Sequence, residues 1–228
     1  MAPPSVDWGG VHNARELGGS LAPGALFRSA RLDGLDAAAW AQLTASGVRT
    51  IVDLRNDDEV VPLPLRPGHL RVIRAPIEDQ GDASFMAEWG DRLGSPDYYA
   101  EGLRRWPGLI AAAIGAVADA PDGGVLVHCA AGRDRTGLIV ALLLRAVGVP
   151  IAVVLDDYEV GVRAINEWFR TNVDREPHLD AAALAVSLAA KRASLATFLG
   201  ALDVDAYLAG AGVTPERLER LRARLVVA

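Results

Sequence analysis

Residues 124–147 carry the sequence GVLVHCAAGRDRTGLIVALLLRAV, which decides the fold. The continuous apolar run Gly124–Val127 predicts a buried strand, and the largely apolar stretch from Thr136 to Val147 predicts a helix. Between them lies Cys129, the one cysteine of the chain. A strand, a short loop and a helix are typical of α/β proteins, which bind ligands at the carboxyl ends of their strands.

The loop after this strand has the composition of a nucleophilic site that holds an oxyanion. Five residues separate Cys129 from Arg135. The backbone N–H groups of Ala130–Arg135 can turn inward as donors to phosphate oxygens, and the dipole of the following helix adds a favourable potential. That potential stabilises the thiolate, and the Arg135 guanidinium can hold two phosphate oxygens. Such a thiolate can displace an alcohol from phosphorus, which gives a phosphocysteine that water hydrolyses.

An alternative is that Cys129 is a buried core residue, as free cysteines usually are. Its neighbours argue against that alternative. A core cysteine needs neither Gly132 nor the charged run Arg133-Asp134-Arg135, which is costly to bury unless it surrounds an anion. The sequence therefore favours a catalytic cysteine.

The loop resembles the signature of the cysteine-dependent protein tyrosine phosphatases, which is His-Cys, five residues, Arg, and then Ser or Thr. The chain is most similar to the atypical bacterial group typified by a mycobacterial tyrosine phosphatase. That group carries Gly-Lys-Asp-Arg-Thr-Gly where residues 132–137 are GRDRTG. Arg133 replaces the lysine of the group, which keeps the charge but presents a wider, planar fork.

Other segments extend the resemblance over nearly the whole chain. They are residues 13–19 (NARELGG), 26–30 (LFRSA), 52–59 (VDLRNDDE) and 207–214 (YLAGAGVT). The resemblance implies an α/β, protein tyrosine phosphatase-like fold, with a central, mostly parallel sheet flanked by helices and a helical C-terminal third. It also implies a single phosphatase domain over residues 1–228, in which helices between about residues 150 and 205 could form a lid over the site.

Each residue of the loop has an expected role. Cys129 is the nucleophile and Arg135 holds the phosphate. His128 should orient the loop through hydrogen bonds to the backbone, because neighbouring residues of a strand point to opposite faces. Thr136 could donate to the sulfur, cap the helix, or do both. The residues expected to contact substrate are His128, Ala130, Ala131, Gly132, Arg133, Asp134 and Arg135.

A general acid must protonate the leaving oxygen. Asp134 is the first candidate, since it lies inside the loop beside Arg135. Asp79 is the second, because it follows a predicted strand on a loop that could close, and Asp82 is a third.

A further charged group could face a ligand at the end of a strand or fix the cysteine loop through buried ion pairs. It consists of Asp53, Arg55 and Glu59. We favour the structural role for these residues, and for Arg15 near the N-terminus we favour a role as a support of the loop.

The composition narrows the class of protein further. A net charge of −6 argues against a nucleic-acid partner. One cysteine and four scattered histidines predict neither a disulfide framework nor a metal site, and no cofactor is expected. The sequence has no run of 18 apolar residues, which predicts no membrane helix. It shows no N-terminal signal peptide, which predicts a cytoplasmic location. Export without a recognisable signal is left open. The oligomeric state is not predicted.

Outside the cysteine loop, alternating elements support an α/β sheet. We predict strands over 26–29, 48–54 and 70–76, a helix over 35–45 capped by Asp36, and a helix after Ser95 that Trp106-Pro107 interrupts. Residues 1–11 are expected to form a loose arm, and residues 78–95 an irregular, functional loop. After Val149 the chain is expected to be helical.

Three functions fit these features. The leading hypothesis is a phosphomonoester hydrolase that acts through phosphocysteine, for which the resemblance implies phosphotyrosine and also phosphoserine, phosphothreonine or phosphoinositide substrates. The second is a rhodanese-like sulfurtransferase, whose loop is typically shorter and lacks this spacing from cysteine to arginine. The third is a phospho-ligand-binding protein without turnover, against which the intact Cys129, Arg135 and Thr136 argue.

Overall fold

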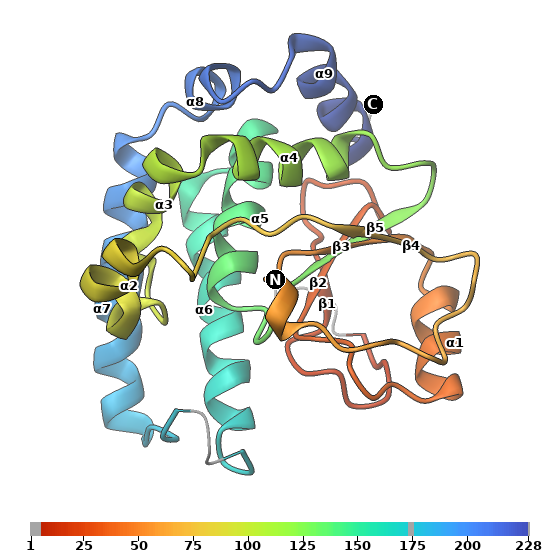
Figure 1. Ribbon diagram of the computed structural model, residues 1–228, viewed down its shortest axis with the longest axis horizontal. Coiled ribbons are helices and arrows are strands. Elements are labelled where there is room, and N and C mark those ends of the chain that lie inside the picture. The colour runs from red at the N-terminus through yellow and green to blue at the C-terminus, as the bar shows by residue number, and fades with distance from the viewer. Residues whose placement is uncertain (1–5, 173–175, 228) are drawn as a thin grey trace.

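The computed structural model describes residues 6–172 and 176–227. Its centre is a five-stranded sheet in the order β1-β2-β5-β3-β4 (Figure 1). Only the β1–β2 pair is antiparallel, and β2–β5, β5–β3 and β3–β4 are parallel. The strands are β1 (Arg15–Glu16), β2 (Leu26–Ser29), β3 (Val48–Asp53), β4 (Arg71–Arg74) and β5 (Gly124–His128). The predicted mostly parallel sheet is confirmed, with the strand before the cysteine at its middle.

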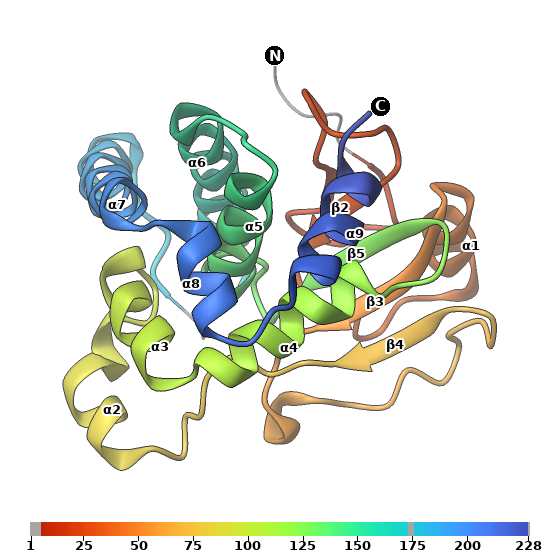
Figure 2. The same cartoon turned by 90° about the horizontal axis from the view of Figure 1, so that it is seen from above.

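Helices cover both faces of this sheet, as expected from parallel strands joined by helical connections (Figure 2). Their bounds are α1 (Ala37–Ala45), α2 (Ala83–Trp89), α3 (Tyr99–Arg105), α4 (Pro107–Ala118), α5 (Asp134–Ala146), α6 (Ile151–Trp168), α7 (Ala181–Ala201), α8 (Val204–Gly210) and α9 (Pro215–Leu225). The chain after Val149 is helical over most of its described residues, as predicted.

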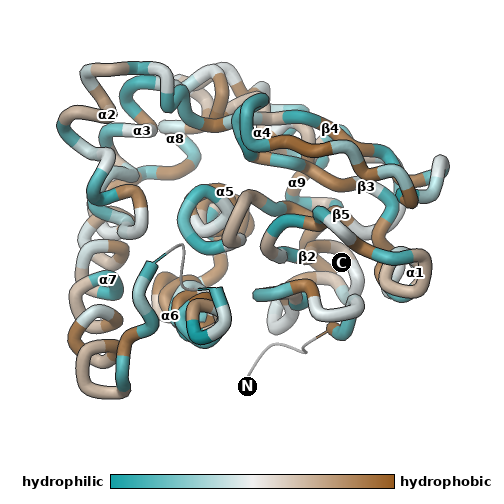
Figure 3. Tube along the Cα trace, turned by 60° about the horizontal axis from the view of Figure 1, so that its bottom comes forward, coloured by the Kyte–Doolittle hydropathy of each residue, from teal (hydrophilic) through white to brown (hydrophobic). Residues whose placement is uncertain are grey.

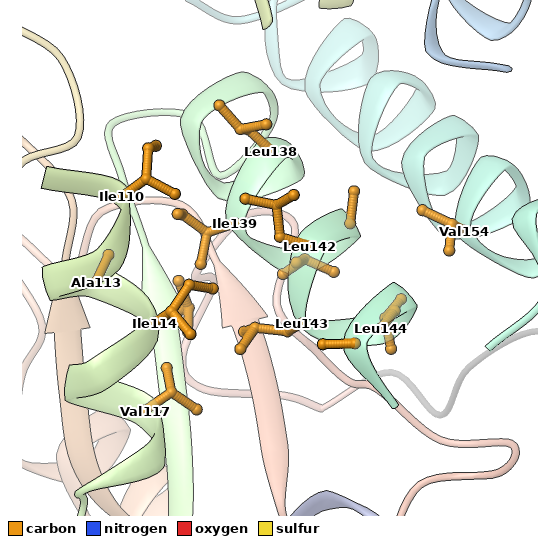
Figure 4. Close-up of a cluster of buried hydrophobic side chains, with 14 of the residues drawn as sticks. Ile110, Ala113, Ile114, Val117, Leu138, Ile139, Leu142, Leu143, Leu144 and Val154 are labelled. Carbon is orange, nitrogen blue, oxygen red and sulfur yellow. The ribbon is translucent and has the colours of Figure 1, made fainter. Parts of the chain in front are cut away.

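The larger core lies between the sheet and the α4–α5 side. Side chains of α4 and α5 point toward one another there, among them Ile110, Ile114 and Ile139 (Figure 4). All three are fully buried. In Figure 3 the tube along β3 is largely hydrophobic in colour. This packing anchors α5, and therefore the loop that precedes it.

The opposite face carries a smaller core, to which the N-terminal segment contributes. Trp8 is only 1 % exposed and packs against Phe27, with ring centroids 5.8 Å apart. The prediction of a loose arm is therefore wrong at Trp8, while residues 1–5 of that arm lie outside the described residues.

The segment 78–95 is also more ordered than predicted, because it contains α2. The Asp82 carboxylate caps this helix by accepting the N–H groups of Ser84 and Phe85. Phe85 is fully buried, and its ring lies 4.7 Å from that of Trp106. A cap and one buried aromatic side chain thus stabilise a seven-residue helix in a polar sequence.

Helices α6 and α7 lie side by side (Figure 1). By length and composition only, α7 is long and apolar enough to cross a membrane, which the sequence analysis does not anticipate. A few hydrophilic residues lie among its mostly hydrophobic ones (Figure 3). At its centre, Arg192 pairs with Asp156 of α6 at 2.7 Å, and Lys191 donates to the Gly94 carbonyl.

Candidate active site

A cavity of about 580 Å³ opens at the carboxyl end of β5. Cys129 and Arg135 both line it, as do Ala130, Ala131 and Arg133. Other walls come from segments far apart in sequence. They are Glu78 and Gln80 after β4, Gly90–Ser95 after α2, Trp168, Phe169 and Glu176 at the α6–α7 connection, and Lys191 in the middle of α7. The predicted loop thus lies at the wall of a cavity large enough for a small ligand.

The carbonyl groups of the cysteine loop are held by donors elsewhere in the protein. The Ala130 carbonyl accepts the Arg31 N–H at 3.0 Å. The Asn13 side-chain amide donates to the carbonyls of Ala131 and Gly132, and the Arg28 guanidinium donates to that of Gly132. Among the described residues, the N–H groups of Ala130 and Ala131 have no acceptor. These N–H groups are therefore available to the cavity as donors to an anion.

Cys129 lies at the base of this loop and is 3 % exposed. Its Sγ accepts the Gly132 N–H at a distance of 3.2 Å. A hydrogen bond to sulfur and the N-terminus of α5 both stabilise a thiolate.

Arg135 lies on the first turn of α5, between two carboxylates. Its two terminal nitrogens pair with the two oxygens of Glu59, one of them at 2.7 Å. Its Nε lies 3.4 Å from Glu78 Oε1. Burial opposes the charged guanidinium, but Glu59, Cys129 and Glu78 outweigh burial and raise the pKa of Arg135. Conversely, Arg135 outweighs burial at Glu59 and lowers the pKa of that carboxyl. The guanidinium is therefore permanently charged, and the carboxylates hold it against the cavity.

Asp134 also lines the cavity, but both its oxygens are engaged. Oδ2 accepts Arg133 Nε at 2.7 Å, and Oδ1 accepts the Tyr158 hydroxyl at 3.0 Å. Its backbone carbonyl accepts the Tyr99 hydroxyl at 2.7 Å, a contact that gives Tyr99 a role the sequence does not indicate. Because α5 begins at Asp134, two residues earlier than predicted, Asp134 lies on a helical turn.

Arg133 reaches from the loop to the segment before α7. Its terminal nitrogens form a bidentate pair with Glu176, at 3.0 and 2.7 Å. Trp168, Phe169, Glu176 and Lys191 all come from the region predicted to form a lid, and all line the cavity. The region therefore covers the predicted site, and its opening and closing remain a prediction.

The other two candidate acids lie differently. Asp79 is exposed, is not among the residues that line the cavity, and accepts the Gly81 N–H at 2.8 Å. Asp82 caps α2 and pairs with Arg105 at 2.7 Å. Hydrogen bonds from Phe85, Ser84 and Arg105 lower the pKa of Asp82. The structure thus brings Asp134, and neither Asp79 nor Asp82, to the cavity.

His128 and Thr136 flank the loop without lining the cavity. His128 Nδ1 lies 3.2 Å from the Cys129 carbonyl, which agrees with the predicted orienting role, and not with substrate contact. Burial lowers the pKa of His128, so its ring is neutral. Thr136 is the third residue of α5, whose N-cap is Arg133, and its buried hydroxyl has no hydrogen-bond partner, the Cys129 sulfur included, among the described residues. The capping alternative is therefore wrong.

Asp53 and Arg55 form a buried ion pair at 2.9 Å, and Arg55 also pairs with Asp33 at 2.8 Å. This is the structural role that we favour from sequence. Glu59 belongs to the active site instead, through its contact with Arg135.

A buried network supports the loop from behind. Asp157 of α6 accepts hydrogen bonds from Arg15, at 2.8 Å, and from Arg28. Burial and the neighbouring Arg28 lower the pKa of Arg15 to about 10, against the influence of Asp157. The predicted support by Arg15 is confirmed in position, but it acts through Asp157 and Asn13, which the sequence analysis did not single out.

A family model described as "Tyrosine phosphatase family" matches residues 6–227. The chain belongs to the tyrosine phosphatase family. It is similar to the triple specificity protein phosphatase PtpB of Mycobacterium tuberculosis, with 30 % identity over 271 aligned positions that cover 95 % of this chain and 97 % of PtpB. A tyrosine-protein phosphatase of Nostoc commune is 31 % identical over 160 residues, which cover 68 % of this chain and 54 % of that protein. Among solved structures, TpbA of P. aeruginosa aligns with a TM-score of 0.44 and 20 % identity, covering 88 % of this chain and 91 % of that one.

Membership of this family of hydrolases confirms the resemblance inferred from the loop and the expected enzyme class. In this tyrosine phosphatase, sequence reasoning missed Glu78, which is 3 % exposed and lines the cavity beside Arg135. In the sequence, Glu78 follows a predicted strand, a position where site residues often lie. The adjacent Asp79 follows the same strand, so this position does not distinguish the two acids.

The loop of this tyrosine phosphatase requires glycine at position 132. Gly132 has φ +65°, and a Cβ there would lie 2.1 Å from the Ser29 carbonyl oxygen. Gly132→Ala should therefore displace the loop and lower kcat/KM for an aryl phosphate by about 100-fold, as expected for a misplacement of about 1 Å. Steady-state kinetics and urea unfolding test this expectation.

Gly148→Ala is the matched control, since Gly148 has φ +80° but open space around its Cβ position. It should lower stability by about 1–2 kcal/mol through backbone strain, with kcat/KM preserved. Equal activity in the two variants would contradict the assignment of a close contact at Gly132.

Proposed function

We propose that this tyrosine phosphatase hydrolyses phosphate monoesters through a phosphocysteine, and that phosphoserine, phosphothreonine and phosphoinositide head groups are substrates besides phosphotyrosine. The observation that carries the proposal is one cavity that holds the Cys129 thiol, the Arg135 guanidinium and free backbone donors together. A thiolate there faces a phosphorus atom whose oxygens are held by Arg135 and the loop.

The charge of the cavity supports the wider range of substrates. Five basic side chains line it, which are Arg31, Arg92, Arg133, Arg135 and Lys191. One phosphate occupies Arg135 and the loop, and Arg133 and Lys191 already contact Glu176 and the Gly94 carbonyl, so Arg31 and Arg92 remain for further acidic groups. Arg31 makes a long contact to Asp33, at 4.0 Å, and its guanidinium lies 5.9 Å from the Trp168 ring centroid. Arg92 stacks on Trp89, with its guanidinium 4.1 Å from the ring centroid, and donates to the Glu88 carbonyl at 2.9 Å. The similar PtpB is named for triple specificity, which agrees with this proposal.

Turnover in the presence of EDTA tests the reaction class. We expect hydrolysis of p-nitrophenyl phosphate, phosphotyrosine and phosphoserine peptides, and an inositol phosphate. Rapid acid quench followed by mass spectrometry should find the phosphoryl group on the peptide that contains Cys129. A folded, reduced protein that turns over none of these would support the alternatives of a binding protein or a sulfurtransferase, for which thiosulfate with cyanide is the next substrate pair.

The Arg31→Ala/Arg92→Ala double variant tests the role of the extra charges. It should lower kcat/KM for the inositol phosphate severalfold and change that for p-nitrophenyl phosphate less, because only the former carries distant phosphates. Arg71→Ala is the matched control, since Arg71 is exposed on β4 and does not line the cavity. Equal losses on both substrates would count against phosphoinositide recognition.

A further inference from the structure

Glu78 is a buried carboxyl group whose second oxygen has no partner. The residue is 3 % exposed and lines the same cavity as Cys129. Its Oε1 accepts the Gln80 side-chain amide at 2.6 Å. Its Oε2 is buried and makes no hydrogen bond with any described residue. Because an orphaned buried oxygen is costly, it indicates an atom that a bound ligand would contact.

Three other carboxylates around the cavity are committed to protein partners, and a fourth, Asp91, lines the cavity but is exposed to solvent. Glu59 gives both oxygens to Arg135, and Asp134 gives its two to Arg133 and Tyr158. Glu176 pairs with Arg133 through both oxygens. Glu78 differs from all four because its free oxygen is buried.

Burial favours the protonated form of Glu78, and the charges that face it act in both directions. Arg135 of α5 lies 3.4 Å from Oε1 and is already paired with Glu59, and the Tyr98 side chain also lines the cavity. Burial raises the pKa of Glu78, and the nearby Glu59 acts in the same direction, against Arg135, Gln80 and Tyr98. A thiolate and a phosphate dianion in the cavity would add negative charge and oppose ionisation further.

We infer that Glu78 is the general acid, which gives its proton to the leaving oxygen of the substrate. This inference rests on the proposed phosphatase reaction. Cys129 Sγ forms a bond to phosphorus, the bond from phosphorus to the ester oxygen breaks, and that oxygen takes the proton of Glu78. In the second step a water oxygen bonds to phosphorus as the P–S bond breaks, Glu78 takes the water proton, and the thiolate is restored.

The leaving-group dependence of Glu78→Gln tests this assignment. Removal of a general acid lowers kcat/KM most for substrates with poor leaving groups. We expect kcat/KM for phenyl phosphate to fall by about 100-fold or more, and that for p-nitrophenyl phosphate by less than about 10-fold. The variant should also lose the basic limb of the pH profile of kcat/KM, whereas inhibition by inorganic phosphate should not weaken. Glu78→Asp should recover part of the activity on phenyl phosphate.

Glu88→Gln is the matched control for the same chemical change, because Glu88 is exposed on α2 and does not line the cavity. Circular dichroism and thermal unfolding check that Glu78→Gln folds. Equal losses on both substrates, with weaker phosphate inhibition and an unchanged pH profile, would mean that Glu78 only positions Arg135 and would overturn the inference. So would the leaving-group signature in Asp134→Asn or Asp79→Asn in place of Glu78→Gln. A wild-type protein that hydrolyses neither ester would refute the proposed function itself, before any variant is compared.

Discussion

Replacing Cys129 by serine is expected to abolish turnover of p-nitrophenyl phosphate, with kcat lowered on the order of 10⁵-fold, as for removal of other enzymic nucleophiles. A hydroxyl retains its proton near neutral pH and is a much weaker nucleophile than a thiolate. Initial-rate measurements with EDTA present check this.

The Cys129→Ser variant should keep its fold and its ligand affinity. The loop carbonyls are held by Asn13, Arg28 and Arg31, none of which contacts the sulfur. Titration calorimetry should therefore still detect phosphotyrosine binding, and thermal unfolding should match that of the wild type. Residual turnover above about one per cent of the wild-type rate, with contamination excluded, would contradict Cys129 as the nucleophile, since a 100-fold loss corresponds to only about 2.7 kcal/mol of barrier.

The second large effect is expected at Asp157, where Asp157→Asn should lower the free energy of unfolding by about 3–5 kcal/mol. Asp157 is the shared acceptor of Arg15 and Arg28, whose side chains are almost fully buried. Without its charge, two guanidinium groups stay buried beside one another. Urea unfolding measures the loss, and kcat/KM should fall too, because Arg28 also holds the Gly132 carbonyl.

Asp156→Asn is the matched control, one residue away. Asp156 is largely exposed and pairs with Arg192 on the surface, so its loss should cost less than about 1 kcal/mol. A loss as large in this variant as in Asp157→Asn would contradict the role assigned to the buried network.

The pKa of Asp157 determines whether this contribution to the free energy of unfolding rises or falls with pH. Burial raises this pKa, but Arg28 and Arg15 outweigh burial and lower it below its ordinary value. A lowered folded pKa contributes stability that is present above the unfolded value, near 3.9, and is lost as the pH falls through the folded pKa. Asp157→Asn should therefore flatten the acid side of the stability profile.

The helices and strands that could be predicted are those that depend on nearby residues in the sequence. The apolar run before Cys129 and the helix after it depend on neighbours within one strand or a few turns, and both are present as β5 and α5. The same holds for α1, where Asp36 caps the helix as expected. The spacing from Cys129 to Arg135 sufficed to place the two together at one cavity.

What could not be predicted depends on contacts between distant segments. Trp8 is buried because Phe27 of β2 and the sheet lie beneath it, and nothing near Trp8 in sequence indicates that surface. Glu78 and Asp79 are neighbouring acids, and only the path of the chain after β4 turns the first into the cavity and the second toward solvent. Tyr99 likewise gains its partner Asp134 across 35 residues of sequence.

The buried network also determines when, during synthesis of the chain, the active site can form. Asn13, Arg15 and Arg28 leave the ribosome early, the cysteine loop follows about a hundred residues later, and Asp157 emerges last. Until α6 is synthesised, the two arginines lack the counter-charge that lets them remain inside. We therefore expect a nascent chain that already contains Cys129 to lack a formed phosphate-binding loop, so that the enzyme becomes reactive only after α6 has been synthesised.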